Sequence, residues 1–311
     1  MRVLLAYDAS GGAEEAVALA SALRWPAGSA VRVVAVIEPS AALVPAVPLT
    51  TAGLVTSPEI EAQIREQLAS DVDGVVRRLK TANLAAEGVV LNGRAASVIV
   101  DEARRFSADV VVAGSRGHGP IATLVLGSVS AELVDHATCP VLVARGRSAK
   151  RVLLASDGSA FASHAESLVA AWPMFEEADI RVISVAEVVR PWHTGLAPSM
   201  YRQVVEAYAS DLAKAKTEQD AVARGAVERL TAAGRSADAK LRVGDAAAEI
   251  IDEASSWGAD LVVLGSRGLT GLSRIVLGSV ARNVLQGTHT SVLIVHAPSH
   301  TRDEADTGAE A

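Results

Sequence analysis

The chain has 311 residues, of which half are hydrophobic and only 3% aromatic, and its formal net charge is −7. This length predicts about two domains of ~150 residues, and the composition predicts cores of Val, Leu, Ile and Ala, as in helices packed on a buried sheet. The acidic balance and the absence of a Lys- or Arg-rich run argue against nucleic acid or an anionic membrane as a partner.

Two further features concern the compartment. The single cysteine, Cys139, cannot form an internal disulfide, which fits a reducing cytosol. The longest uncharged stretch, residues 39–58, contains four prolines and is therefore a poor membrane helix. We expect a soluble, cytoplasmic protein.

In chain order, the first half alternates strand and helix patterns. An apolar strand from Arg2 ("RVLLAYDAS") precedes a helical segment near Gly11, and a second strand from Val31 precedes a helix from Glu59. A later helix, "AASVIVDEARRF" from Ala95, leads into the continuously apolar strand "VVVAG". Such apolar, β-branched runs are typical of parallel strands covered by helices on both faces. We count five strands and four helices.

The second half repeats the first with an offset of 149 to 151 residues. "RVLLAYDAS" at Arg2 matches "RVLLASDGS" at Arg151, and "CPVLVARG" at Cys139 matches "TSVLIVHA" at Thr290. A repeat this long indicates two copies of one domain. The polar connector "RGRSAK" predicts a boundary, giving domains at 1–147 and 148–298 and a disordered acidic tail at 299–311.

Strands alternating with helices predict the α/β class with right-handed crossovers. We expect two tandem doubly wound domains, each a five-stranded parallel sheet in the order 3-2-1-4-5 with about four helices. The segments after the second strand of each copy, residues 38–56 and 187–198, are long enough to suggest functional loops.

A glycine-marked loop occurs in both copies: "GSRGHGPIATLVLGS" from Gly114 to Ser128, and "GSRGLTGLSRIVLGS" from Gly265 to Ser279. Each follows an apolar strand and ends where a helix begins. Ligands of open α/β sheets bind at this edge, and helix N-termini favour phosphate. The alternative is turn chemistry, with the two serines as N-caps. The loops lack the Gly-Lys-Ser/Thr ending of a P-loop and do not follow the first strand, which excludes a P-loop and a dinucleotide fingerprint.

These motifs carry a family resemblance. With "AYDAS" and "ASDGS" after the first strand of each copy, the spacing Gly-x2-Gly-x9-Gly-Ser twice, and "CPVLV", the chain resembles the universal stress protein family in its tandem form. The glycine spacing resembles the signature of the ATP-binding members. The resemblance implies ATP as ligand, with or without Mg²⁺.

The resemblance also implies roles for individual residues. Asp8 and Asp157 would lie near the adenosine, and the backbone of Val36 and Val185 would face the adenine ring. The positions implied to line the ribose and phosphates are Gly114, Arg116, Gly117, Gly127, Ser128, Val129 and Ser130 in the first copy, and Gly265, Arg267, Gly268, Gly278, Ser279 and Val280 in the second. Ala281 replaces Ser130 in the second copy, which predicts a weaker second site.

Three functions remain open at this point. The leading one is an ATP-binding protein in which the nucleotide is a structural or signalling ligand in a stress response, since we find no positioned lysine and no evident general base. The alternatives are a slow ATP hydrolase or nucleotidyl-transfer enzyme, and a ligand-free interaction module. We assign no catalytic residues.

No metal site is assigned, because the candidate histidines have no neighbouring ligands at suitable spacing. These histidines are His136, His289, His296 and His300. The repeated carboxylate pairs, Asp101-Glu102 and Asp252-Glu253, are interpreted as solvated helix faces, and Cys139 as a small buried residue.

The last strand of each copy would lie at a sheet edge, where a bare apolar edge needs a partner. The resemblance implies pairing through this strand. We therefore expect the two domains to pack with these edges together as an internal pseudo-dimer, with homodimerisation of the whole chain left open.

Overall fold

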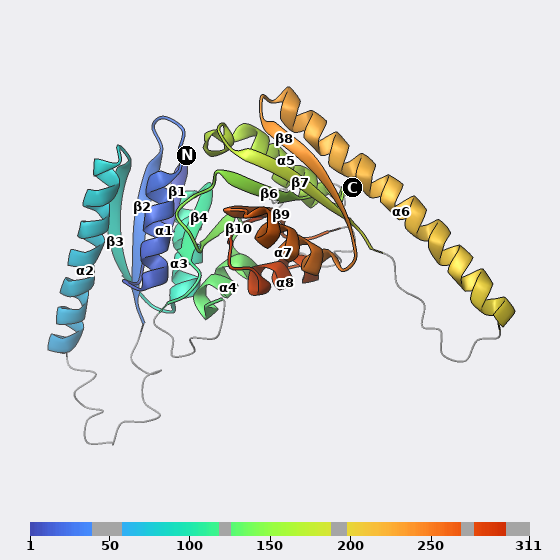
Figure 1. The fold of residues 1–311 in the computed structure, drawn as a ribbon. Helices are drawn as coiled ribbons and strands as arrows, with labels where there is room; N and C mark the ends of the chain where they lie inside the picture. The colour runs from blue at the N-terminus through green and yellow to red at the C-terminus, as the bar shows by residue number, and fades with distance from the viewer. Residues whose placement is uncertain (39–57, 118–125, 188–197, 269–276, 297–311) are drawn as a thin grey trace, which may run out of the picture.

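The structure is a computed structural model that describes residues 1–38, 58–117, 126–187, 198–268 and 277–296 (Figure 1). The predicted functional loops after the second strands lie largely outside the described residues, as do the middle of both glycine loops and the acidic tail.

Within the described residues, each half of the chain contains five strands and four α-helices, as the sequence predicted. The first half comprises β1 (Arg2–Ala6), α1 (Gly11–Ala22), β2 (Ala30–Ile37), α2 (Pro58–Thr81), β3 (Ala85–Asn92), α3 (Ala95–Phe106), β4 (Val110–Gly114), α4 (Ser128–His136) and β5 (Val141–Ala144). The second comprises β6 (Arg151–Ala155), α5 (Ala160–Ala171), a 3₁₀ turn η2 (Pro173–Phe175), β7 (Asp179–Ala186), α6 (Pro198–Ala232), β8 (Ser236–Val243), α7 (Ala246–Trp257), β9 (Leu261–Gly265), α8 (Ser279–Gly287) and β10 (Ser291–Val295).

The strands form one ten-stranded sheet in the order β3-β2-β1-β4-β5-β10-β9-β6-β7-β8. Among the described residues, the strand pairs within each half are parallel, and the order is the expected 3-2-1-4-5. β5 and β10 pair antiparallel, so the two halves meet at the centre of the sheet. The predicted fold class is confirmed.

Both faces of the sheet are buried, because strand side chains alternate between two hydrophobic cores. Val3 and Leu5 of β1 belong to the core beneath α1, α2, α5 and α6, whereas Leu4 and Ala6 belong to the core beneath α3, α4, α7 and α8. Figure 1 shows these two helical layers on either side of the sheet. This burial explains why the inner strands, such as β4 and β9, have continuously apolar sequences rather than alternating ones, whereas the outer strands β3 and β8 are more exposed and more polar.

The helix boundaries follow local capping. Ser10 and Ser159 precede α1 and α5, and each side chain accepts a hydrogen bond from a first-turn amide. α3 and α7 end at residues in the left-handed conformation, Ser107 and Gly258. The helix pairs α1 and α5, and α3 and α7, therefore start and stop at equivalent positions in the two halves.

The halves differ most in one helix. α6 has 35 residues and α2 has 24, and the extra length carries α6 past the end of the sheet (Figure 1). In the part of the chain that the structure describes, no helix combines the length and apolarity needed to span a membrane.

Candidate functional site

A short polar loop connects β1 to α1 and is hydrogen-bonded to the chain that follows β4. The Asp8 carboxylate accepts a hydrogen bond from the Ser10 amide at 3.0 Å. The Ser10 hydroxyl oxygen caps α1 through the Ala13 amide at 3.2 Å, and the hydroxyl donates to the carbonyl of Arg116 at 3.1 Å. Ser10 thus fixes the loop after β1 against the start of the glycine loop. Sequence analysis did not single it out, although "DAS" and "DGS" recur at this position.

The second half repeats the first part of this arrangement. The Asp157 carboxylate accepts from the Ser159 amide at 2.9 Å, and the Ser159 hydroxyl caps α5 through the Ala162 amide at 3.2 Å. Asp8 is exposed beside Arg116 and Gly117 in the first half. The two predicted aspartates therefore occupy matching positions at the edge where ligands of this fold class bind.

The first glycine of each loop allows close packing of the strand end on a helix. A Cβ built on Gly114 would overlap the backbone of Gly12 in α1. A Cβ on Gly265 would lie 2.8 Å from Phe161 in α5. Neither glycine has a positive φ, so the lack of a side chain, rather than an unusual backbone conformation, explains the residue type.

The second glycine brings the aspartate and the glycine loop together. A Cβ on Gly117 would lie 2.6 Å from Oδ2 of Asp8, and a Cβ on Gly268 would lie 2.5 Å from Oδ2 of Asp157. In both halves, then, the carboxylate after the first strand lies against the backbone of the glycine loop. Two residue types that the sequence places over a hundred residues apart form one local group.

The third glycine, and not the serine, is the N-cap of the following helix. Gly127 has the extended dihedrals of a cap (φ −75°, ψ 157°), and its amide donates to the Ser115 carbonyl at 2.7 Å. Gly278 has φ −62° and ψ 155°, and its amide donates to the Ser266 carbonyl at 2.8 Å.

The alternative interpretation, in which Ser128 and Ser279 are N-caps, is therefore wrong. Both are the first helical residues and are exposed. The cap residues Gly127 and Gly278 offer no side-chain acceptor to α4 and α8. The first-turn amides lack intrahelical acceptors, so the N-cap position leaves them without a side-chain oxygen. This is the condition under which an anion is favoured at a helix N-terminus.

The residues after these caps are less accessible. Val129 and Val280 are half-buried and pack against the hydrophobic core. The Ser130 hydroxyl is buried and donates to the Gly114 carbonyl at 2.6 Å. Ala281 replaces it in the second half and is also buried. The two copies thus differ at a buried position beneath the end of β4, where only the first copy has a hydroxyl that bonds the strand-end carbonyl of Gly114.

The strand alternation gives Val36 and Val185 a specific backbone orientation. The Val34 carbonyl of β2 accepts from Tyr7, whereas the Ile37 carbonyl accepts from Gly93 after β3. Successive residues of a central strand form backbone hydrogen bonds alternately to its two neighbours, so the backbone N–H and C=O of Val36 point to the β1 side. The β1–β2 register ends at Ala6–Val34, so Val36 lies beyond it. By the same reasoning, the backbone groups of Val185 point to the β6 side and lie beyond the last β6–β7 register pair, Ala155–Ile183.

The two arginines of the glycine loops have different environments. Arg116 is exposed, and its carbonyl holds Ser10. Arg267 is half-buried, with its guanidinium carbon 5.7 Å from the ring centroid of Phe161. The described ends of the two loops are therefore alike in backbone hydrogen bonding and differ in side-chain contacts.

Tyr7, immediately before Asp8, is held as a hydrogen-bond donor. Its hydroxyl donates to Oε1 of Glu14 at 2.9 Å, and Arg78 pairs with Glu14 at 2.7 Å. Burial and the bond to Glu14 raise the pKa of Tyr7 to about 12. Tyr7 therefore stays neutral near pH 7 and does not act as a base. Its counterpart in the second half is Ser156, which donates to Glu166 at 2.6 Å.

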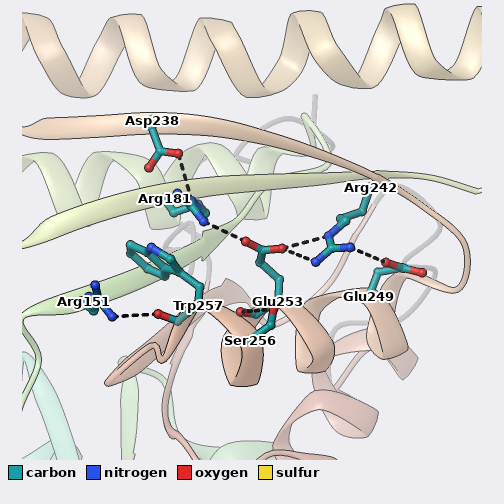
Figure 2. Close-up of polar contacts among 8 residues, drawn as sticks. All are labelled: Arg151, Arg181, Asp238, Arg242, Glu249, Glu253, Ser256 and Trp257. Atoms are coloured by element: carbon teal, nitrogen blue, oxygen red, sulfur yellow. Dashed lines mark hydrogen bonds and ion pairs between the residues drawn. The ribbon is translucent and has the colours of Figure 1, made fainter.

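A different polar cluster, in the second half, was misjudged from the sequence. Figure 2 shows the Glu253 carboxylate between Arg181 of β7 and Arg242 of β8, at 2.9 and 2.5 Å. The side chain of Glu253 is 3% exposed, and the Trp257 ring centroid lies 4.6 Å from the Arg181 guanidinium. Desolvation acts to raise the pKa of Glu253, but the hydrogen bonds from Arg242 and Arg181 outweigh it, and the pKa lies below its usual value.

The first half has the matching cluster. Arg32 of β2 pairs with Glu102 at 2.7 Å and packs over Phe106, with 4.2 Å from its guanidinium carbon to the ring centroid. Asp101 and Asp252 are exposed as predicted. The prediction of a solvated face is wrong for Glu102 and Glu253, which turn inward to neutralise an arginine on an otherwise apolar strand. The sequence signal for this pairing was the single arginine within each of the two strands, Arg32 and Arg181.

Within the described ranges, no group of three or more His, Cys, Asp or Glu side chains could hold a metal ion. Cys139 is half-buried, and burial raises the pKa of its thiol to about 11. His296 makes a structural contact, its Nε2 lying 2.9 Å from the Val134 carbonyl of the other half.

Comparison with known proteins identifies the family. The profile of the universal stress protein family matches residues 1–145 and again residues 148–296. The chain belongs to the universal stress protein family. It contains two such domains in tandem.

Relatives agree with this assignment. A universal stress protein of Thermus aquaticus is 34% identical over 143 residues, which are 46% of this chain and 97% of that protein. One from Mycolicibacterium smegmatis is 31% identical over 228 residues, 70% of each chain. A Synechocystis relative is 36% identical over 102 residues, 32% of this chain and 66% of its own length.

Among solved structures, a universal stress protein from Archaeoglobus fulgidus has a TM-score of 0.65 at 18% identity, covering 96% of this chain and 97% of its own. That similarity supports the fold. A universal stress protein solved in complex with cAMP covers 47% of this chain and 96% of its own at 25% identity, with a TM-score of 0.32.

Proposed function

We propose that this universal stress protein binds ATP, one molecule in each domain, as a structural or signalling ligand in a stress response. Each site would comprise the carboxyl ends of the first two strands of a domain, the ends of its glycine loop, and the N-terminus of the following helix. The adenine would lie beside the backbone of Val36 or Val185, and the phosphates near Gly127 or Gly278.

The observation that carries the proposal is the uncapped helix N-terminus, built twice. Gly127 and Gly278 leave the first-turn amides of α4 and α8 without a side-chain acceptor, at the edge of the sheet where ligands bind. A structural turn alone would favour Ser, Asp or Asn at a cap position. Glycine there keeps the amides accessible to an external oxygen.

The residues present favour binding over catalysis. Neither glycine loop contains a lysine or a carboxylate. The carboxylates of Asp8 and Asp157 each accept a backbone amide, and Tyr7 is a fixed donor. Phosphoryl transfer requires a charged clamp and a positioned nucleophile. If Mg²⁺ accompanies ATP, the phosphate oxygens and one aspartate supply the oxygen donors that it prefers.

Calorimetric titration with ATP tests the proposal directly. We expect saturation at up to two ATP per chain, with weaker binding in the domain that has Ala281 in place of Ser130. Parallel titrations with cAMP and with ATP in MgCl₂ define the ligand, and nucleotide analysis over hours detects ADP. No heat and no retained nucleotide would refute the assignment, whereas steady release of ADP would favour the slow hydrolase.

We further propose that residues 1–147 and 148–298 form an internal pseudo-dimer. The antiparallel pairing of β5 with β10 supports this arrangement. Whether whole chains also associate is tested by sedimentation velocity across a concentration series.

A further inference from the structure

The β5–β10 seam is centred on equivalent residues. Leu142 faces Leu293, and these leucines occupy the same position in the two copies. The remaining register pairs, Val143–Val292 and Val141–Ile294, lie on either side. The backbone alone would therefore accept a like domain from a second chain as readily as the other domain of the same chain.

The residue after β5 and the residue after β10 each contact a backbone carbonyl in a helix of the other domain, but their side chains differ. Arg145 donates to the carbonyl of Leu285 in α8 at 2.6 Å. Its counterpart, His296, lies 2.9 Å from the carbonyl of Val134 in α4, the residue equivalent to Leu285. Since a carbonyl only accepts, Nε2 of His296 carries the proton.

Two further contacts occur on one side of the seam alone. Arg282 of α8 pairs with Asp135 of α4 at 3.0 Å, and the equivalent positions hold Ala131 and Gln286, which carry no charge. The Arg145 amide donates to the hydroxyl of Ser291 at 3.0 Å. The equivalent of Ser291 is Pro140, which has neither a hydroxyl nor an amide hydrogen.

A pair of like domains would lose the ion pair, and a pair of first domains would also lose the bond to Ser291. In a pair of second domains each Ser291 hydroxyl would instead meet the backbone amide of His296. Two first domains would place Asp135 opposite Ala131 and the Arg145 amide opposite Pro140. Two second domains would place Arg282 opposite Gln286. Two first domains would also desolvate two Arg145 guanidinium groups, and desolvation of the single one already lowers the pKa of Arg145 to about 10.

We propose that the Asp135–Arg282 pair makes each domain's seam surface specific for the other domain of this chain type and selects against pairing of like domains between chains. The Arg145–Ser291 hydrogen bond adds selection against pairs of first domains. The partner that this surface fits is thus an unlike domain carrying the complementary charge. Specificity arises because a pair of like domains lacks favourable contacts that the pair of unlike domains makes.

Charge reversal in the full chain tests this selection. Arg282→Asp places two carboxylates across the correct seam, while in like-domain pairs each carboxylate faces a neutral residue. We expect this variant to gain species of higher mass by light scattering and to exchange its β5 and β10 amides at least tenfold faster than the wild type. Asp135→Arg should behave in the same way.

The double variant Asp135→Arg/Arg282→Asp restores an oppositely charged pair and should recover the wild-type mass and exchange rates. Arg94→Glu is the matched control, since Arg94 pairs with Glu132 of α4 within the first domain at 2.6 Å. It should leave the mass unchanged. The proposal is overturned if both single reversals keep the wild-type mass and exchange rates, or if the double variant behaves like the single ones.

Discussion

Replacing the two N-cap glycines by aspartate separates a phosphate site from a structural turn. In Gly127→Asp the new Cβ would lie 3.4 Å from the Ser115 carbonyl oxygen, an ordinary contact, and φ of −75° suits any residue. The carboxylate would accept the first-turn amides of α4, where the phosphates are proposed to bind. Gly278→Asp repeats the change in α8, with contacts of 3.3 Å that require a small shift.

The two interpretations predict different results. As a cap, aspartate should raise the free energy of unfolding by about 0.5 kcal/mol, since glycine is only a few tenths of a kcal/mol worse and the helix dipole favours the charge. As a neighbour of a phosphate at ~4 Å, it should cost ATP binding about 1 kcal/mol in water and about 4 kcal/mol near a protein surface. The affinity should then fall between about fivefold and about a thousandfold.

Calorimetric ATP titration and urea unfolding on the same preparation measure both quantities. Gly127→Asn/Gly278→Asn is the matched control, because asparagine caps equally well and adds nearly the same volume without charge. It should lose much less affinity than the aspartate variant. If the aspartate variant is as stable as the wild type and binds ATP equally well, the phosphates do not lie at these helix ends.

Three further predictions concern stability. Glu253→Ala should lower the free energy of unfolding by about 1.5–3 kcal/mol because it removes charge-assisted hydrogen bonds from Arg181 and Arg242, which keep Asp238 and Glu249 as partners. Glu87→Ala, which removes an exposed partner, should cost under ~1 kcal/mol in the same urea titration. Burial lowers the pKa of His296 below 6.5, so the folded state favours the neutral ring; stability present above pH 6.5 should fall as the pH drops below it, and thermal unfolding of His296→Asn should lose that part of the dependence. Gly114→Ala should cost about 1–3 kcal/mol by overlapping the backbone of α1, while Gly74→Ala in α2, whose Cβ has room, should add up to ~1 kcal/mol; equal effects on urea midpoints would contradict the packing argument.

The sequence was sufficient to predict the fold because its patterns are local and occur in both copies. Continuous β-branched runs such as "VVVAG" and helical segments such as "AASVIVDEARRF" each identify one element, and the helix boundaries of the latter agree with α3. Alternation of strand and helix then limits the topology, since crossovers are right-handed. The repeat gave the two-domain organisation without any knowledge of contacts.

The site could be predicted as residue types but not as roles. Spacing identified Gly127 and Ser128 as a helix start, yet which one is the cap depends on backbone dihedrals set by the bond from the Gly127 amide to Ser115. The contact of Gly117 with Asp8 joins segments over a hundred residues apart, and no local pattern records it.

Burial of charge was likewise decided by tertiary structure. Helical periodicity gave Glu102 and Glu253 the same solvated face as their aspartate neighbours, but Arg32 and Arg181 on the underlying strands reverse that outcome. Both arginines are half-buried beneath a helix and the glutamates are buried, and a buried carboxylate needs such a partner, so each glutamate turns inward to pair with its arginine. The sequence by itself determined the elements, their order and their duplication, because those follow from short-range pattern. Only the packed structure decided which polar groups are buried, capped or paired across the seam, because each of those depends on a partner distant in the chain.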